Sequence, residues 1–310
     1  MSSQHDRHNM MLDEALGPEV LTMLANPKTQ EIMLNADGTL WVEYQGKAME
    51  QVGWRSATHI ERIIRLTASW SAKEVTHASP SLAATLPTGQ RFQGYLPPLV
   101  EAPTITIRCP SHRTLMKKDF VPSVCSEEIF DALSDAVTEK KNIVVSGELG
   151  SGKTALVSTL MSYIGPEERI GTAEDVKELR ITGSNFVRFY TNKDRDLYDC
   201  TYEALRARID RFIPSEIRDG KAALATLNAW LAMTPGGLCT VHAKSAMATL
   251  TRLEYLCAQT GKGDYRPLIG EVVDIIVHME RVDRQRRISN ALRIDTWNGE
   301  HYVTKNLLEH

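Results

Sequence analysis

The residues with the clearest chemical meaning in this chain are a glycine-rich run followed by a lysine and a threonine. Residues 147–154 read Gly-Glu-Leu-Gly-Ser-Gly-Lys-Thr and fit the pattern G-x-x-x-x-G-K-[ST]. In such a loop the glycines let successive backbone N–H groups point inward at an anion. The positive end of the following helix dipole adds to the attraction. The pattern therefore predicts a P-loop, a cradle for the phosphates of a nucleotide.

Individual residues of this run have separate expected roles. Lys153 can reach the β- and γ-phosphates, and the Thr154 hydroxyl can ligate Mg²⁺. The positions expected to surround the phosphates are Gly147, Gly150, Ser151, Gly152, Lys153, Thr154 and Ala155. We therefore predict that the chain binds ATP with Mg²⁺. A glycine-rich strand–helix turn without a ligand is the alternative, but it does not account for the Lys-Thr pair.

The residues on either side supply the elements that such a loop needs. The β-branched run 142–146 predicts a buried strand, and residues 155–161 predict a helix that begins at Gly152. From about residue 126 onward, helical and strand-like patterns alternate, which indicates a parallel sheet covered by helices. Residues 222–241 contain no charge but include Pro235, so we predict a buried helix, a loop and a buried strand rather than a membrane span.

The first 110 residues have a different pattern, typical of a small α+β domain. We expect helices over about 10–24 and 57–70, a β-hairpin of 32–35 and 40–44 with an Asp-Gly turn, and strand-like pieces at 91–96 and 104–108. The predicted organisation is an N-terminal domain over 1–110, a polar and basic linker over 111–125, and an α/β domain over 126–307.

Composition limits the classes of protein that need to be considered. A chain of 310 residues is long enough for two ordinary domains. The formal charge of −3 and the pI near 6.3 argue against a broad nucleic-acid binder. The five scattered cysteines form no C-x-x-C pair, which favours a reducing compartment. The polar residues 1–7 predict no secretory signal, so we expect a cytoplasmic protein.

Three further segments place acids or a histidine at the ends of short strands. An NTPase needs such groups for the metal, the attacking water and the γ-phosphate. The segments are residues 170–179 with Glu174 and Asp175, residues 205–218 with Glu216, and residues 233–243 with His242. Each residue also has a plain structural alternative. Glu174 and Asp175 can cap a helix, Glu216 can pair with Arg218 or Lys221, and His242 can be a core histidine.

The order of these segments resembles that of the secretion-ATPase superfamily, which powers type II secretion, type IV secretion and type IV pili. Its named parts are a Walker A loop, an Asp box, a Walker B box and a His box. Beyond these boxes, further stretches resemble the type IV secretion ATPases of conjugative plasmids, the TrbB kind. The stretches that carry this second resemblance are 34–43, 89–98, 106–108 and 252–254.

The resemblance implies roles for several residues. Glu174 would position a metal-bound water and help hold Mg²⁺, and Glu216 would orient or deprotonate the attacking water. His242 would report on the γ-phosphate. Arg91 and Arg108, in the N-terminal domain, match basic positions that reach the nucleotide when the two domains close. Cations placed at developing phosphoryl charge accelerate the reaction by orders of magnitude.

The resemblance also implies an architecture and a function. We expect an α/β fold, a RecA-like P-loop NTPase core with a smaller α+β N-terminal domain. We expect a homo-hexameric ring on the cytoplasmic face of the inner membrane, working with membrane components of a secretion apparatus. It would hydrolyse ATP to drive pilus biogenesis or substrate transfer. Alternatives are a type II secretion or type IV pilus motor, a nucleic-acid translocase, and a nucleotide-gated assembly scaffold.

The chain departs from the family pattern at several positions. Ser215 stands where the family has glycine, Ile209 where it has proline, and residues 233–236 replace Gly-His-Pro-Gly. Pro214 fits the Walker B strand only at the strand end, because proline donates no ladder hydrogen bond. These departures concern ATP hydrolysis more than nucleotide binding, so the nucleotide-gated assembly scaffold remains an alternative function.

One basic cluster lies outside these boxes. It consists of Arg281, Arg284, Arg286 and Arg287. Such a run is typical of a solvated turn between strands. The alternative is contact with nucleic acid or acidic lipid, but no aromatic residues are interleaved with it, and we expect no strong nucleic-acid binding.

Overall fold

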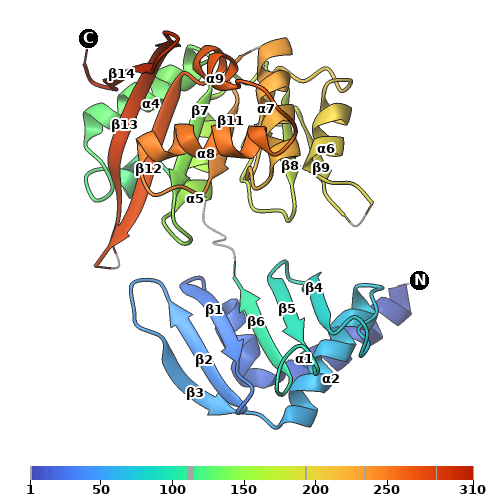
Figure 1. The fold of residues 1–310 in the computed structure, drawn as a ribbon. Helices are drawn as coiled ribbons and strands as arrows, with labels where there is room; N and C mark the ends of the chain where they lie inside the picture. The colour runs from blue at the N-terminus through green and yellow to red at the C-terminus, as the bar shows by residue number, and fades with distance from the viewer. Residues whose placement is uncertain (1, 110–114, 193, 234, 284, 310) are drawn as a thin grey trace. The chain divides into compact units, whose positions relative to one another are not determined.

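The structure is a computed structural model that describes residues 2–109, 115–192, 194–233, 235–283 and 285–309 (Figure 1). The chain divides into two compact units, Met1–Arg113 and Thr114–His310. Each unit has its own buried core, and each is described by itself below.

The first unit is a six-stranded antiparallel sheet in the order β3-β2-β1-β6-β5-β4, packed against two helices (Figure 1). Its elements are α1 (Ser2–Ala25), β1 (Thr29–Leu34), β2 (Thr39–Tyr44), β3 (Glu50–Trp54), α2 (Ala57–Trp70), β4 (Ser81–Thr85), β5 (Arg91–Tyr95) and β6 (Thr104–Arg108). Alternate strand residues are buried, as in a sheet with one face on the core.

The predicted elements of this unit are present. β1 and β2 pair antiparallel across the Asp-Gly turn, and α2 has the predicted bounds, with Ser56 accepting a hydrogen bond from the backbone N–H of His59. α1 extends further toward the N-terminus than the predicted helix. It also bends at Gly17, whose φ of 77° lies outside the helical region, just before Pro18 restarts the helix.

The second unit contains a five-stranded sheet, β11-β7-β12-β13-β14, and a three-stranded sheet, β10-β8-β9. Its strands are β7 (Ile143–Gly147), β8 (Ile170–Glu174), β9 (Phe186–Tyr190), β10 (Arg211–Pro214), β11 (Leu238–Val241), β12 (Ile275–Val282), β13 (Gln285–Trp297) and β14 (Tyr302–Asn306). Its helices are α3 (Lys117–Phe120), α4 (Glu127–Thr138), α5 (Lys153–Leu160), η1 (Met161–Tyr163), α6 (Leu197–Ala204), α7 (Gly220–Ala232), α8 (Ala246–Ala258) and α9 (Arg266–Val272).

The two sheets meet beside β10 and β11. The backbone N–H of Ile217 donates to the carbonyl of Thr240 at 2.8 Å, and the Thr240 hydroxyl donates to the carbonyl of Ser215 at 2.7 Å. The spatial order is therefore β9-β8-β10-β11-β7-β12-β13-β14. The paired neighbours from β9 to β12 all run parallel. Between the chain that follows β10 and strand β11 there is a single bridge, which is also parallel.

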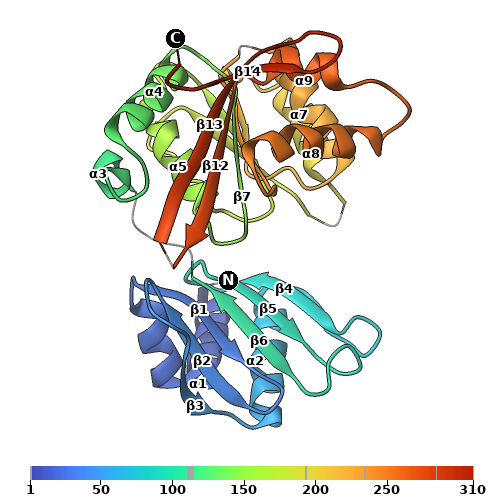
Figure 2. The ribbon, with the colours of Figure 1, turned by 60° about the vertical axis from the view of Figure 1, so that its left-hand side comes forward.

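Helices cover both faces of this sheet (Figure 2). Neighbouring residues of one strand point to opposite cores: Val144 lies in the core that includes α6 to α9, whereas Ile143 and Val145 lie in the core that includes α4 and α5. This is the doubly covered parallel sheet that the alternating pattern predicts. Its geometry brings the carboxyl ends of β8, β10, β11 and β7 to one edge.

Part of the predicted linker, residues 115–125, is folded against the second unit. It includes α3, and both Phe120 and Cys125 are buried in the core beside Phe130 of α4. Residues 110–114 lie outside the described residues, so the exact bounds of the linker stay a prediction. Among the helices of the described ranges, none combines the length and apolar character needed to cross a membrane.

Candidate functional site

The glycine-rich loop connects β7 to α5 in the way its sequence predicts. β7 ends at Gly147, and Gly152 is the N-cap of α5. Gly147 and Gly152 have φ values of 149° and 99°, which side chains rarely allow. A Cβ atom on Gly147 would also lie 2.1 Å from the carbonyl oxygen of Met279. The loop therefore depends on glycine at these positions.

Lys153 lies inside this loop and is buried. Its Nζ donates to the carbonyl oxygens of Gly147 at 3.0 Å and Glu148 at 2.9 Å. These bonds hold the ammonium group at the mouth of the cradle, where a phosphate can compete for it. Thr154 follows in the first turn of α5 and is half-buried.

His242 directly follows β11, the strand beside β7. Its Nδ1 lies 3.1 Å from the carbonyl oxygen of Gly147 and 3.4 Å from Lys153 Nζ. The imidazole is 44% exposed, so it contacts the P-loop while remaining open to a ligand. It is therefore not a histidine enclosed in the core.

Glu216 follows β10, on the other side of β11 from the P-loop strand. Its Oε1 lies 2.7 Å from His242 Nε2, and its Oε2 accepts a hydrogen bond from Arg218 at 2.7 Å. Apart from this contact with His242, the buried Oε1 has no hydrogen-bond partner within the described part of the chain. This oxygen retains capacity for another partner. Pro214 is the last residue of β10, the position at which a proline is tolerated.

The two acids of the Asp box have different surroundings. Glu174 is fully buried, and its carboxylate accepts hydrogen bonds from Arg188, the Thr172 hydroxyl and two backbone N–H groups, those of residues 178 and 179. Asp175 accepts a hydrogen bond from Arg218 at 2.5 Å, and the same guanidinium group also donates to Glu216. The structure therefore connects Lys153 to Asp175 through His242, Glu216 and Arg218. Glu174 lies in a separate network.

The residues fit a magnesium ion that arrives with its nucleotide. Within the described ranges there is no group of three or more His, Cys, Asp or Glu side chains placed to hold a metal by themselves. A hydroxyl such as that of Thr154, combined with phosphate oxygens and water, is the usual magnesium environment. In this arrangement both oxygens of Glu174 are already bonded, so its predicted metal role would require Arg188 to leave.

Arg91 and Arg108 lie next to each other in the first unit. They are register partners on β5 and β6, on the face of the sheet that is only half-buried. Arg108 Nε lies 3.8 Å from Glu31 Oε1, and burial raises the pKa of Glu31. Their reach toward a nucleotide stays a prediction.

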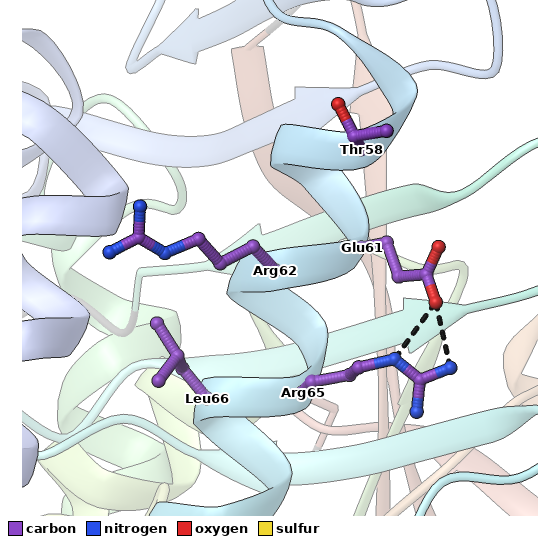
Figure 3. Close-up of a pocket in the computed structure, with 5 residues that line it drawn as sticks. All are labelled: Thr58, Glu61, Arg62, Arg65 and Leu66. Carbon is purple, nitrogen blue, oxygen red and sulfur yellow. Dashed lines mark hydrogen bonds and ion pairs between the residues drawn. The ribbon is translucent and has the colours of Figure 1, made fainter.

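One surface hollow of the first unit is lined by residues of α2, on the exposed side of that helix (Figure 3). Its lining includes Arg65, which forms an ion pair with Glu61 at 2.7 Å, and Arg62, which points away from that pair. These are helix-surface contacts of low energy, and the hollow contains none of the predicted site residues.

Two site residues were not predicted as such from the sequence. The sequence indicates Arg218 only as a salt-bridge partner of Glu216, although in the structure it joins that acid to Asp175. Arg188, which binds Glu174, follows the Asp box on the next strand and carries no motif that could have identified it.

A parallel sheet with a glycine-rich phosphate loop, an acid and a histidine at its carboxyl edge defines a RecA-like P-loop nucleotide-binding core. The comparison with known families specifies the class further. Residues 14–294 match the family described as Type II/IV secretion system protein, and the chain belongs to that family of secretion ATPases.

Individual relatives agree with this assignment. The chain is 35% identical to the conjugal transfer protein TrbB of Rhizobium radiobacter, over 97% of this chain and 94% of that protein. It is 32% identical to the type IV secretion system protein PtlH of Bordetella pertussis, over 88% of this chain and 91% of that protein. The structure of the ATPase DotB from Legionella pneumophila has the same fold, with a TM-score of 0.64 at 18% identity, covering 88% of this chain and 79% of that one.

Proposed function

We propose that the protein is the ATPase of a conjugative type IV secretion system, which hydrolyses ATP to drive pilus biogenesis or substrate transfer. The observation that carries the proposal is the contact of His242 with both Lys153 and Glu216, three residues that follow three different strands, β11, β7 and β10. The likeness to a conjugal transfer protein over nearly the whole chain supports the conjugative role.

The geometry suggests what each residue does. When the phosphates enter, Lys153 exchanges its two carbonyl partners for phosphate oxygens, and the backbone N–H groups of the loop bind the remaining charge. Magnesium, held in part by Thr154, would supply charge neutralisation on the phosphates. Oε1 of Glu216, whose contact among the described residues is with His242, accepts a hydrogen bond from the attacking water and orients it.

His242 contacts both the P-loop and Glu216, so it can report the presence of a γ-phosphate to the acid that positions the water. Glu174 fixes Arg188 and the chain around residue 178, which supports the edge of the sheet on which these groups lie. Arg91 and Arg108 are proposed to reach the nucleotide upon closure of the two domains. The assembly is proposed to be a homo-hexamer that docks on the cytoplasmic face of the inner membrane.

A nucleotide-gated assembly scaffold is the second candidate. It is favoured by the Arg218 bond that already holds one oxygen of Glu216, and by the missing first histidine of the His box. Such a protein would bind ATP and assemble, with little turnover.

The full-length chain distinguishes these candidates when phosphate release, nucleotide binding and mass are measured together. We expect Lys153→Ala to lose nucleotide binding, and Glu216→Gln to bind ATP while turnover falls about 100-fold or more. Lys141→Ala is the matched control, because Lys141 precedes the opposite end of β7 and pairs with Asp274. Binding without turnover in the wild type would favour the scaffold. A strictly monomeric protein at all concentrations would argue against the motor.

A further inference from the structure

The hairpin of β12 and β13 extends beyond the strand that carries the P-loop (Figures 1 and 2). Met279 is the last residue of β12 that pairs with β7, opposite Gly147. β12 continues to Val282, and these additional residues pair only with β13. The hairpin therefore places side chains beside the loop that follows Gly147.

The two faces of this extension differ in what they contact. Glu280 and Arg287 are register partners on one face, and they form an ion pair with each other. Met279, Arg281 and Arg286 lie on the other face, which is directed at the P-loop. Part of the basic cluster is therefore in contact with the nucleotide site and is not simply a solvated turn.

The approach of Arg286 to the P-loop is close. Its Nε donates to the carbonyl oxygen of Gly150 at 3.1 Å. A Cβ atom on Gly152 would lie 3.0 Å from Arg286 Cδ and 3.4 Å from Met279 Cε. The arginine stem thus packs on the Cα of Gly152, and its head group is bonded to Gly150.

The pairing of Arg281 with Arg286 is also informative. Like charges at directly opposed positions of two strands are unfavourable unless other groups offset them. Here the Gly150 carbonyl is one such group, and an Arg281 nitrogen would lie 3.8 Å from a Cβ atom on the same glycine. A polyphosphate bound in the loop would offset both charges further.

We propose that Arg286 is a positioning residue for the P-loop, which it holds from outside in the conformation that binds phosphate. The proposal rests on the nucleotide binding proposed above. Gly150 and Gly152 both have positive φ, and such residues are free to leave this conformation in the absence of contacts. A loop held in its bound shape loses less entropy when the ligand arrives, which raises affinity.

The mechanism predicts a specific kinetic signature. Because Arg286 acts on the loop and not on the reacting γ-phosphate, it contributes equally to ADP and ATP binding. Uniform binding of this kind changes KM and leaves kcat unchanged. A residue that stabilised the transition state would have the opposite effect.

The test is equilibrium titration of the full-length protein with ADP·Mg²⁺, together with steady-state hydrolysis of ATP. We expect Arg286→Ala to weaken ADP binding about tenfold, the order expected for one charge-assisted hydrogen bond. KM for ATP should rise by a similar factor with kcat within about twofold. Arg286→Lys, which keeps a charged donor, should recover part of the loss.

Arg287→Ala is the matched control, since it removes the neighbouring arginine from the opposite face of the same hairpin. It should bind ADP as the wild type does. Equal weakening by Arg286→Ala and Arg287→Ala would overturn the proposal, as would unchanged ADP affinity in Arg286→Ala. A fall in kcat with unchanged affinity would also overturn it. If the wild type itself bound no ADP, the proposed function would be wrong, whereas failure of Arg286→Ala alone leaves that function intact.

Discussion

Glu174 and Glu216 lie at the same edge of one sheet, but their surroundings are different. Glu174 is completely buried, and its two oxygens are bonded to a guanidinium, a hydroxyl and two backbone N–H groups. Glu216 is 17% exposed, and the contact of its Oε1 among the described residues is with His242. A saturated carboxylate stabilises the fold, whereas a carboxylate whose oxygen can accept a further hydrogen bond can act on a ligand.

The difference arises from the strands that flank each acid. Glu174 ends β8, which lies inside the sheet between β10 and β9, so Arg188 on β9 can reach it. Glu216 follows β10 where the two sheets meet, and His242 follows β11, the next strand along the sheet.

The largest expected effect is the difference in stability between variants that lack one or the other carboxylate. We expect Glu174→Ala to reduce the free energy of unfolding by about 3–5 kcal/mol, since Arg188 would remain as an unpaired and largely buried charge. Glu216→Ala should cost about 1 kcal/mol or less, because its partner Arg218 is half-exposed and keeps Asp175. Denaturant unfolding of both variants measures the difference. Equal losses would contradict the distinction between the two acids.

A smaller effect is expected at Arg218, which joins Glu216 to Asp175. Arg218→Ala removes the group that fixes one oxygen of Glu216, so we expect kcat to fall about tenfold with little change in stability. Phosphate-release assays at saturating ATP measure this change. Lys221→Ala is the control, because it removes an exposed cation in the same segment. Wild-type turnover in Arg218→Ala would show that the acid needs no such support.

The fold was predictable from local patterns. The P-loop, its strand and its helix lie within one short segment, and the residue types at 143–154 specify each part of it. The hairpin of the first unit and the bounds of α2 follow from an Asp-Gly turn and a helical stripe of isoleucines. The additional length of α1 was not predicted, because its polar N-terminal residues show no apolar periodicity.

The contacts within the site were only partly predictable. The motifs identified Lys153, Glu216 and His242, but their direct contact depends on strand order, which places β11 between β7 and β10. The bonds of Glu174 to Arg188 and of Arg286 to Gly150 connect residues from different strands. Sequence spacing alone does not specify which strands become neighbours.

The smallest expected effect is a pH dependence of stability, and it concerns the buried one of two histidines with different surroundings. His242 is 44% exposed, whereas His278 on β12 is buried and its Nδ1 lies 3.0 Å from the Ser146 hydroxyl. Burial lowers the pKa of His278, and the charges that act on it come from Glu280 and Glu148, which oppose this shift, and from Lys153, which adds to it. A histidine whose folded pKa is lowered stays neutral in the folded protein after its unfolded counterpart has taken up a proton.

Stability should therefore fall as the pH drops below about 6.5, the ordinary histidine pKa, because the unfolded chain binds the additional proton there. One group contributes at most about 1.4 kcal/mol per pH unit. We expect His278→Gln, which cannot be protonated, to lose less stability than the wild type between pH 7 and pH 5.5. Denaturant unfolding across this range measures both slopes, with pH 8 as the reference at which His278 is neutral in both states. Parallel slopes would mean that His278 takes up a proton as readily in the folded protein as in the unfolded chain, which would contradict the effect of burial.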